Sequence, residues 1–222
     1  MHITKFGYST LGWIALLIFV LLVIAVFLSN DYIKYSLIGL AFLMLVFSLN
    51  FFRDPDRETP AQDNIIVSPA DGKVLIIKDI LENRFLSSEA QQISIFMSPL
   101  NVHVNRIPVS GTVDYLNYVK GEYLVAFHDK ADSANERNEI GIQTPQGKVL
   151  FTQVAGFVAR RIISTLTKGD SVTIGERFGM IRFGSRVDVI VPKNWIIKVK
   201  KDQTVTAGET ILFEIPDETE KH

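Results

Sequence analysis

The chain of 222 residues contains no cysteine. Without thiols it forms no disulfide, no thiolate nucleophile and no cysteine-ligated zinc site. Histidine is scarce as well. Of the four, His2 and His222 lie near the chain ends, where order is usually poor, so His103 and His128 are the candidate site histidines. Two histidines cannot supply a three-histidine metal centre, and we expect no metal site.

An excess of charge of either sign is also missing. The formal net charge is −1 and the isoelectric point is about 6.4, so no basic field indicates nucleic acid as a partner. The mean hydropathy, +0.21, is high for a soluble protein. The apolar excess is concentrated in the first fifty residues, which differ in character from the rest.

Two uncharged apolar runs of equal length, 11–28 and 35–52, lie near the N-terminus. At a rise of 1.5 Å per residue each run spans roughly 27 Å, close to the hydrocarbon thickness of a bilayer. A signal peptide is disfavoured because no small-residue cleavage site follows the first run. A buried core hairpin is disfavoured because neither run has a polar face. We therefore expect a transmembrane helical hairpin.

Basic residues flank the outer ends of this hairpin: Lys5 precedes it, and Arg53 and Arg57 follow it. The positive-inside rule therefore predicts that both ends lie in the cytoplasm, with the protein in the cell (inner) membrane. The polar, proline-containing stretch that starts at Arg53 ends the second helix. We expect an anchor over residues 1–55 and a second domain over residues 56–222.

The second domain is predicted to be mainly β, a compact barrel or sandwich with little helix. Short β-branched runs alternate there with turn residues. Strands are predicted at residues 65–67, 73–77, 92–97, 102–107, 112–119, 123–127, 139–143, 148–154, 171–174, 180–183, 187–191 and 210–215. Residues 70–72 and 145–147 have the composition of hairpin turns. The best helical pattern in this half covers residues 157–166.

Segments 68–74 and 205–212 look like pieces of a lipoyl-type barrel, although Lys73 lacks the setting of a lipoyl lysine. A non-catalytic membrane-tethered adaptor is therefore one hypothesis. Chemistry is offered instead by the Gly184–Ser185 bond. In a strained turn, a serine hydroxyl attacks its own preceding carbonyl, and glycine leaves that carbon uncrowded. Elimination from the resulting ester and hydrolysis then yield a pyruvoyl group and ammonia.

Six segments, taken together and in order, resemble the phosphatidylserine decarboxylase family in its short bacterial and archaeal branch. They are residues 51–57, 68–72, 96–108, 135–138, 155–162 and 177–188, so the resemblance covers nearly the whole chain from Phe51. Each segment is unspecific alone.

The resemblance implies self-cleavage between Gly184 and Ser185. The products are a large β chain that ends at Gly184 and a small α chain of 38 residues, 185–222, which form a heterodimer. The α chain begins with a pyruvoyl group made from Ser185. This cofactor forms a Schiff base with the serine amine of phosphatidylserine and accepts the electrons released with CO2, which gives phosphatidylethanolamine.

The partners of Ser185 follow from the same resemblance. Asp71 matches a family aspartate that supports self-cleavage, and His103 matches the first histidine of a His-x-x-His pattern in the longer branch. In the longer branch the second histidine belongs to a Ser–His–Asp arrangement, and Arg106 stands at its position here. That arrangement therefore does not carry over intact, and His103 or His128 is the candidate base.

Arginines near the predicted cleavage site are candidates for binding the lipid phosphate or carboxylate, with Arg182 and Arg186 the main ones, and His128 is a further substrate-binding candidate. The lipid backbone stays open, because an archaetidylserine-type ether lipid carries the same head group. A pyruvoyl enzyme for a soluble amino acid is disfavoured by the hairpin. A higher homo-oligomer is neither required nor excluded.

Overall fold

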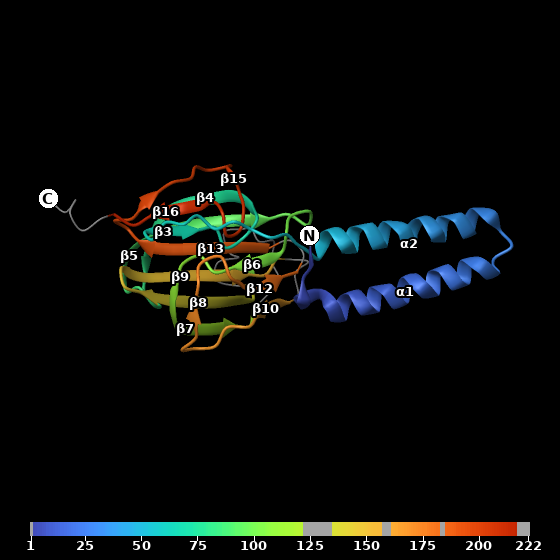
Figure 1. Ribbon diagram of the computed structural model, residues 1–222, viewed down its shortest axis with the longest axis horizontal. Coiled ribbons are helices and arrows are strands. Elements are labelled where there is room, and N and C mark those ends of the chain that lie inside the picture. Colours follow the sequence, from blue (N-terminus) through green and yellow to red (C-terminus); the bar gives the residue numbers. More distant parts are fainter. Residues whose placement is uncertain (1, 122–134, 157–160, 183–184, 217–222) are drawn as a thin grey trace. The chain divides into compact units, whose positions relative to one another are not determined.

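The computed structural model describes residues 2–121, 135–156, 161–182 and 185–216. The chain divides into two compact units, residues 1–56 and residues 57–222. The first unit is a pair of long helices, α1 (Tyr8–Phe27) and α2 (Asp31–Phe51), which run side by side in Figure 1. A short 3-10 helix, η1 (Lys5–Gly7), precedes α1. Strands β1 (His2–Ile3) and β2 (Arg53–Asp54) pair at the open end.

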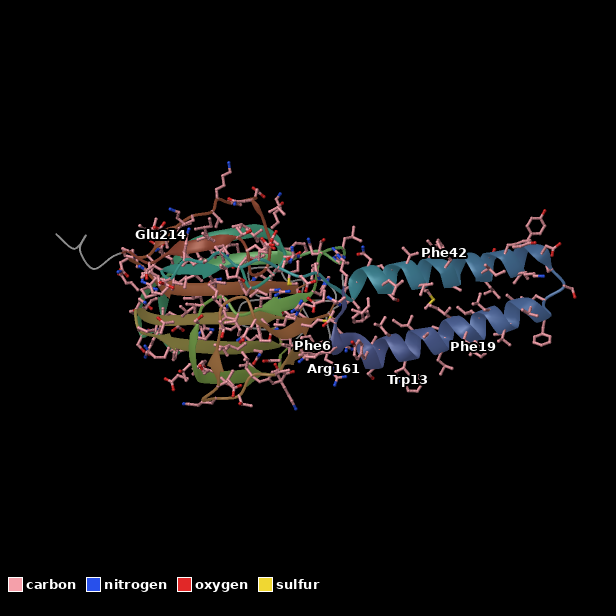
Figure 2. All side chains as sticks on the ribbon, in the orientation of Figure 1. Phe6, Trp13, Phe19, Phe42, Arg161 and Glu214 are labelled. Carbon is pink, nitrogen blue, oxygen red and sulfur yellow. The ribbon has the colours of Figure 1, made fainter. Side chains whose placement is uncertain are left out.

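The break between the helices is encoded locally. Asn30 caps the start of α2, since its Oδ1 accepts hydrogen bonds from the backbone N–H groups of Tyr32 (3.0 Å) and Ile33 (3.3 Å). Both helices are long and apolar enough to cross a membrane. Their large side chains point outward, as Figure 2 shows for Trp13, Phe19 and Phe42. This exposure fits contact with lipid and does not fit a soluble core.

The second unit is built from antiparallel strands, and its main sheet curls into a half-barrel (Figure 1). Eight strands form this sheet in the order β11-β7-β8-β9-β13-β5-β4-β15. Two three-stranded sheets, β10-β12-β6 and β14-β16-β3, complete the unit. The strands are β3 (Ile65–Val67), β4 (Gly72–Glu82), β5 (Ser88–Met97), β6 (Val104–Arg106), β7 (Gly111–Val119), β8 (Arg137–Thr144), β9 (Gly147–Val154), β10 (Ile162–Ser164), β11 (Ser171–Val172), β12 (Arg177–Ile181), β13 (Ser185–Pro192), β14 (Ile196–Ile197), β15 (Thr204–Val205) and β16 (Ile211–Glu214).

The mainly β prediction is confirmed, with local corrections. The predicted helix over 157–166 is wrong where the structure describes it, because Ile162–Ser164 form strand β10, paired with β12. Two β-branched residues and a partner strand override the apolar spacing that favoured a helix. The turn at 145–147 joins β8 to β9 as predicted. The turn at 70–72 is not a hairpin, because β3 and β4 belong to different sheets. The predicted strand 123–127 and residues 157–160 lie outside the described residues.

Alternation along the central strands makes the two faces of the main sheet different. On β13, Val187, Val189 and Val191 enter the main core, which lies on what we call the inner face. Residues 186, 188 and 190 point to the outer face. That face is covered too, by a smaller apolar cluster around Phe85 and Ile190 and by a layer of charged side chains.

Glu139 is the centre of this outer charged layer, and its side chain is fully buried. Its Oε1 accepts from Arg84 Nη1 at 2.7 Å and from Arg137 Nε at 2.9 Å. Its Oε2 accepts from Tyr115 Oη and Asn117 Nδ2, both at 3.0 Å. Burial alone raises the pKa of Glu139, but the hydrogen bonds from Arg137, Asn117 and Arg84 and the Arg84 charge outweigh it and hold the pKa below its ordinary value.

The Glu139→Gln variant should therefore lose pH-dependent stability. A lowered folded-state pKa means that ionised Glu139 stabilises the fold above the ordinary glutamate value of about 4.3, and that this contribution disappears as pH falls through the folded value. We expect the variant to be less stable at neutral pH by about 1–3 kcal/mol, the cost of unsatisfied buried donors. Its thermal unfolding midpoint should fall less steeply on acidification. The exposed Glu89→Gln is the control, and equal pH slopes for wild type and Glu139→Gln would contradict the assignment.

Candidate active site

Ser185 is the first residue of β13, the strand held between β5 and β9. It is fully buried, and it pairs across the sheet with Met97. Its hydroxyl donates to the thioether sulfur of Met97, with an Oγ–Sδ distance of 3.3 Å. Gly184, the predicted cleavage partner, lies outside the described residues, as does His128. The nucleophile candidate is thus placed on the inner face, at one end of the main sheet.

The strand registers define this end, which we call the Ser185 edge. One row of paired residues crosses six strands there: Lys73, Phe96, Arg186, Val154, Arg137 and Val119. Segments that leave these strands at this edge therefore approach Ser185, although the sequence separates them widely. The turn after β5 and the end of β7 are two of them.

A chain of buried amides lies beside Ser185 on the inner face. Asn138 Nδ2 donates to Gln153 Oε1 at 3.0 Å, and Gln153 Nε2 donates to Asn105 Oδ1 at 2.8 Å. Asn105 Nδ2 in turn donates to the carbonyl of Pro69 at 3.3 Å and to Met97 Sδ at 3.9 Å. The sulfur that receives the Ser185 hydroxyl therefore also ends this chain. Sequence reasoning missed these amides. The sequence feature that could have identified them is a polar residue at an inward-facing position of a predicted strand, as Gln153 is.

His103 is fully buried in the segment between β5 and β6. Its Nδ1 lies 2.9 Å from the carbonyl oxygen of Asn101. A carbonyl only accepts, so Nδ1 carries the proton and Nε2 of the neutral ring is the nitrogen that takes up a proton. This is the tautomer that a general base requires. The backbone contact fixes the orientation that an aspartate fixes in other relays.

Arg106, at the position of the longer branch's second histidine, has a structural contact. It is 5% exposed on β6, and its Nη1 donates to the carbonyl of Gly175 at 2.9 Å. The side chain also crosses Gly208, where an added Cβ would come within 2.9 Å of Arg106 Cδ. The arginine thus ties together two turns of the second unit.

Asp71 lies just before β4, whereas Ser185 opens β13, and β5 runs between the two strands. Two strand spacings separate their backbones by about 10 Å. Its Oδ1 accepts from the backbone N–H of Ala207 at 2.8 Å, and its Oδ2 pairs with Arg57 Nη2 at 2.8 Å. The structure therefore brings Asp71 to the Ser185 edge and engages its carboxylate with Arg57 and the β15 turn.

The two predicted substrate arginines lie in different surroundings. Arg186 is 1% exposed on the outer face, where its Nη2 pairs with Asp188 at 2.9 Å, on the side opposite to Ser185. Arg182 lies three residues before Ser185, and its backbone N–H donates to the carbonyl of Arg161 at 3.3 Å. Burial, and then the nearby charge of Arg161, lower the pKa of Arg182. Two like charges that converge beside the site favour an anion there.

A cavity of about 410 Å³ opens beside the amide chain. It is lined by Leu116, Tyr118, Asn138, Ile162, Ser164 and Leu166. Asn138 therefore borders the cavity and, through Gln153 and Asn105, connects with the residues around Ser185. Among the described residues, no group of three or more histidine, aspartate or glutamate side chains is arranged to hold a metal ion.

Comparison with known proteins gives one consistent result. The sequence profile of the phosphatidylserine decarboxylase family matches residues 44–213. The phosphatidylserine decarboxylase proenzyme of Chlorobium phaeobacteroides is 46% identical over 209 residues, which cover 94% of this chain and 98% of the relative. That of Chlorobium limicola is 47% identical over 210 residues (95% and 98%). That of Chlorobaculum tepidum is 44% identical over 213 residues (96% and 97%).

The amide chain yields a prediction about stability. Replacing Gln153 by leucine keeps the approximate volume but leaves the amides of Asn105 and Asn138 without their partner. We expect the free energy of unfolding to fall by about 1–3 kcal/mol for each amide group left without a hydrogen bond, which is measured as a lower midpoint of chemical unfolding. Gln143→Leu, on exposed strand surface, is the matched control and should change stability by less than about 0.5 kcal/mol. A Gln153→Leu variant as stable as the wild type would show that the chain contributes little.

Proposed function

The chain belongs to the phosphatidylserine decarboxylase family, and from that premise we propose that it converts phosphatidylserine to phosphatidylethanolamine with a pyruvoyl group made from its own Ser185. The observation that carries this proposal is the position of Ser185. It is a buried serine at the start of a strand held on both sides. The head-group chemistry is the same for ester-linked and ether-linked lipids, so the lipid backbone is not part of the proposal.

Self-cleavage needs a nucleophile and a base. The Ser185 hydroxyl attacks the carbonyl carbon of residue 184, and the peptide bond to the Ser185 nitrogen breaks as an ester forms. We assign the proton acceptor to Nε2 of His103, because Asn101 fixes its Nδ1–H. Elimination leaves a new carboxylate at residue 184, and hydrolysis at residue 185 releases ammonia. We assign to Asp71, two strand spacings away at the same edge, a supporting role in self-cleavage, with its carboxylate held by Arg57 and Ala207.

The residues around Ser185 fit a group made in place. The α chain, residues 185–222, would contain β13, β14, β15 and β16. Strand β13 is paired with β5 and β9, β15 with β4, and β16 with β3. Because all these partners belong to the β chain, the ladders hold the two products together as a heterodimer. They also keep residue 185 in its place after the bond is cut.

Once formed, the pyruvoyl group supplies the electron sink for the electron pair that CO2 leaves behind. The chain's own residues bind the substrate. We assign the 410 Å³ cavity beside Asn138 to the lipid head group. Arg182 is the group for the lipid phosphate, since Arg161 beside it adds to the local positive charge. Arg186 serves the fold through Asp188 rather than the substrate. The two apolar helices would anchor the enzyme in the cell membrane with both ends cytoplasmic.

The decisive test is the intact mass of purified protein. Wild type should give two chains, the smaller of 38 residues and lighter than its serine form by one ammonia. Ser185→Ala should give a single chain of about 25.0 kDa without decarboxylase activity. Ser94→Ala, another fully buried serine on the neighbouring strand, is the control and should still be cleaved. Cleavage of Ser185→Ala, or a single wild-type chain that decarboxylates phosphatidylserine, would overturn the proposal.

A second prediction concerns the base. His103→Gln removes the imidazole that accepts the proton, and general-base catalysis typically contributes 10²–10⁴-fold. We expect the half-time of self-cleavage, followed on gels from synthesis onward, to lengthen by about that factor. Arg106→Gln should lower the unfolding midpoint without a comparable delay. A His103→Gln variant that is cleaved normally, beside a slow His128→Gln variant, would transfer the role to His128.

A further inference from the structure

We propose that the Ser185 edge is a bilayer-docking surface: Leu100 inserts among the lipids, and Lys120 and Arg161 contact anionic head groups. The inference rests on the proposed function, since it concerns how the β domain meets a substrate that lies in a membrane. It goes beyond anchoring by the two helices, because it says which edge of the domain meets the bilayer.

Leu100 is presented by a rigid turn. The turn joins Ser98 to Asn101, with the backbone N–H of Asn101 bonded to the Ser98 carbonyl at 3.0 Å. The Asn101 side chain accepts from both the N–H (2.8 Å) and the hydroxyl (2.7 Å) of Ser98. Pro99 occupies the second position, where its fixed φ favours the turn. Leu100, 69% exposed, is thus held outward by a structure that loses little entropy on insertion.

The turn lies at the Ser185 edge. It leaves β5 one residue after Met97, the cross-strand partner of Ser185, and it leads to His103. Tyr118, at the end of β7 in the same edge, is 52% exposed and adds an amphipathic ring of the kind found at lipid interfaces. An exposed leucine and an amphipathic aromatic side chain therefore both lie at the Ser185 edge.

Among the described residues, two exposed basic side chains, Lys120 and Arg161, lie near this part of the edge. Lys120 follows β7, and Arg161 precedes β10, next to Arg182. Figure 2 shows Arg161 at the end of the domain opposite to Glu214. The nearby Glu136 is only 4% exposed and accepts a hydrogen bond from the Tyr118 hydroxyl. A surface that pairs one inserted leucine with basic residues suits an anionic membrane, and phosphatidylserine is itself anionic.

The far end of the sheet provides the contrast. Leu81, near the end of β4, is 66% exposed, almost the same as Leu100. It lies nine residues along β4 from Gly72, or about 30 Å from the Ser185 edge. Its surroundings include the carboxylates of Asp79 and Glu89, which share Lys193 between them. An exposed leucine alone therefore does not identify the docking edge. The sign of the charges beside the leucine distinguishes the two ends of the sheet.

The absence of cysteine allows a direct test on the full-length chain. Leu100→Cys and Leu81→Cys, each in the uncleaved Ser185→Ala background, provide single sites for an environment-sensitive fluorophore. Both proteins are reconstituted into vesicles of phosphatidylcholine with or without phosphatidylserine. We expect nitroxide-labelled lipids to quench the label at position 100, and aqueous iodide to quench the label at position 81. Lipid quenching at position 100 should be stronger in vesicles that contain phosphatidylserine than in vesicles of phosphatidylcholine alone.

The charged residues are tested in the same assay. Lys120→Gln with Arg161→Gln should lower the ratio of docked to undocked protein about five-fold per charge in phosphatidylserine vesicles. Lys168→Gln with Lys193→Gln, which are exposed lysines paired with acidic residues elsewhere in the domain, should leave the ratio unchanged. An effect of equal size in pure phosphatidylcholine would argue against head-group contacts.

Three outcomes overturn the proposal: iodide quenching of both labels alike, equal lipid quenching of both labels, or a label at position 100 shielded from lipid and iodide alike. The last outcome would indicate a protein as the occupant of this edge. Because the background variant performs no chemistry, docking is measured separately from decarboxylation. A wild type that decarboxylates phosphatidylserine while position 100 stays in water refutes the docking surface alone. An inserted position 100 without wild-type decarboxylation refutes the proposed function alone.

Discussion

The hydrogen-bond ladders on both sides of β13 are the constraint on which the rest of the structure depends. They run from Ser185 to Pro192 against β5 and from Arg186 to Ile190 against β9. A serine at the start of a central strand has a fixed backbone and no freedom to move with a loop. That position suits the proposed role of Ser185, in which it attacks its own peptide bond and then stays in place as a new chain end.

The same ladders divide the work of β13 between the two faces of the sheet. Alternate valines enter the main core, while Arg186 and Asp188 join the charged layer on the outer face. Buried ion pairs contribute little net stability, but a pair with its partner removed is costly. The main effect of the charged layer is therefore to select a single strand register, and its contribution to the stability of the fold is small. A slip of one residue would place these charges in the apolar core and expose the valines.

The substrate's location explains why the domain needs an oriented edge. On the proposed function, an apolar hairpin would keep the enzyme at the bilayer and raise the local concentration of lipid. The proposed site at one end of the sheet would receive a head group when that end faces the membrane. The proposed docking surface, a rigid leucine turn with basic side chains, would favour that orientation, because each side chain contributes a small free energy without a large interface.

Much of the fold could be predicted from the sequence because the signals were local. Two uncharged runs gave two helices, and short β-branched runs gave most of the strands, while the family-like segments singled out Ser185. The errors arose where long-range pairing decides. Residues 162–164 became a strand because β12 lies beside them. The direction of the Arg186 side chain was likewise not predictable, because the pleat of β13 places it on the face opposite to Ser185.

The amino-acid sequence by itself determined the chemistry available to this protein: a Gly–Ser bond, few histidines, no thiol and a membrane-length hairpin. Only the tertiary structure decided which residues share a site. Strand register aligned segments from 73 to 186 in one row, joined Asn105, Gln153 and Asn138 into one chain, and gave Arg106 a structural contact. Composition and periodicity are properties of neighbours along the chain, whereas register is fixed by the packing of both faces of the sheet at once.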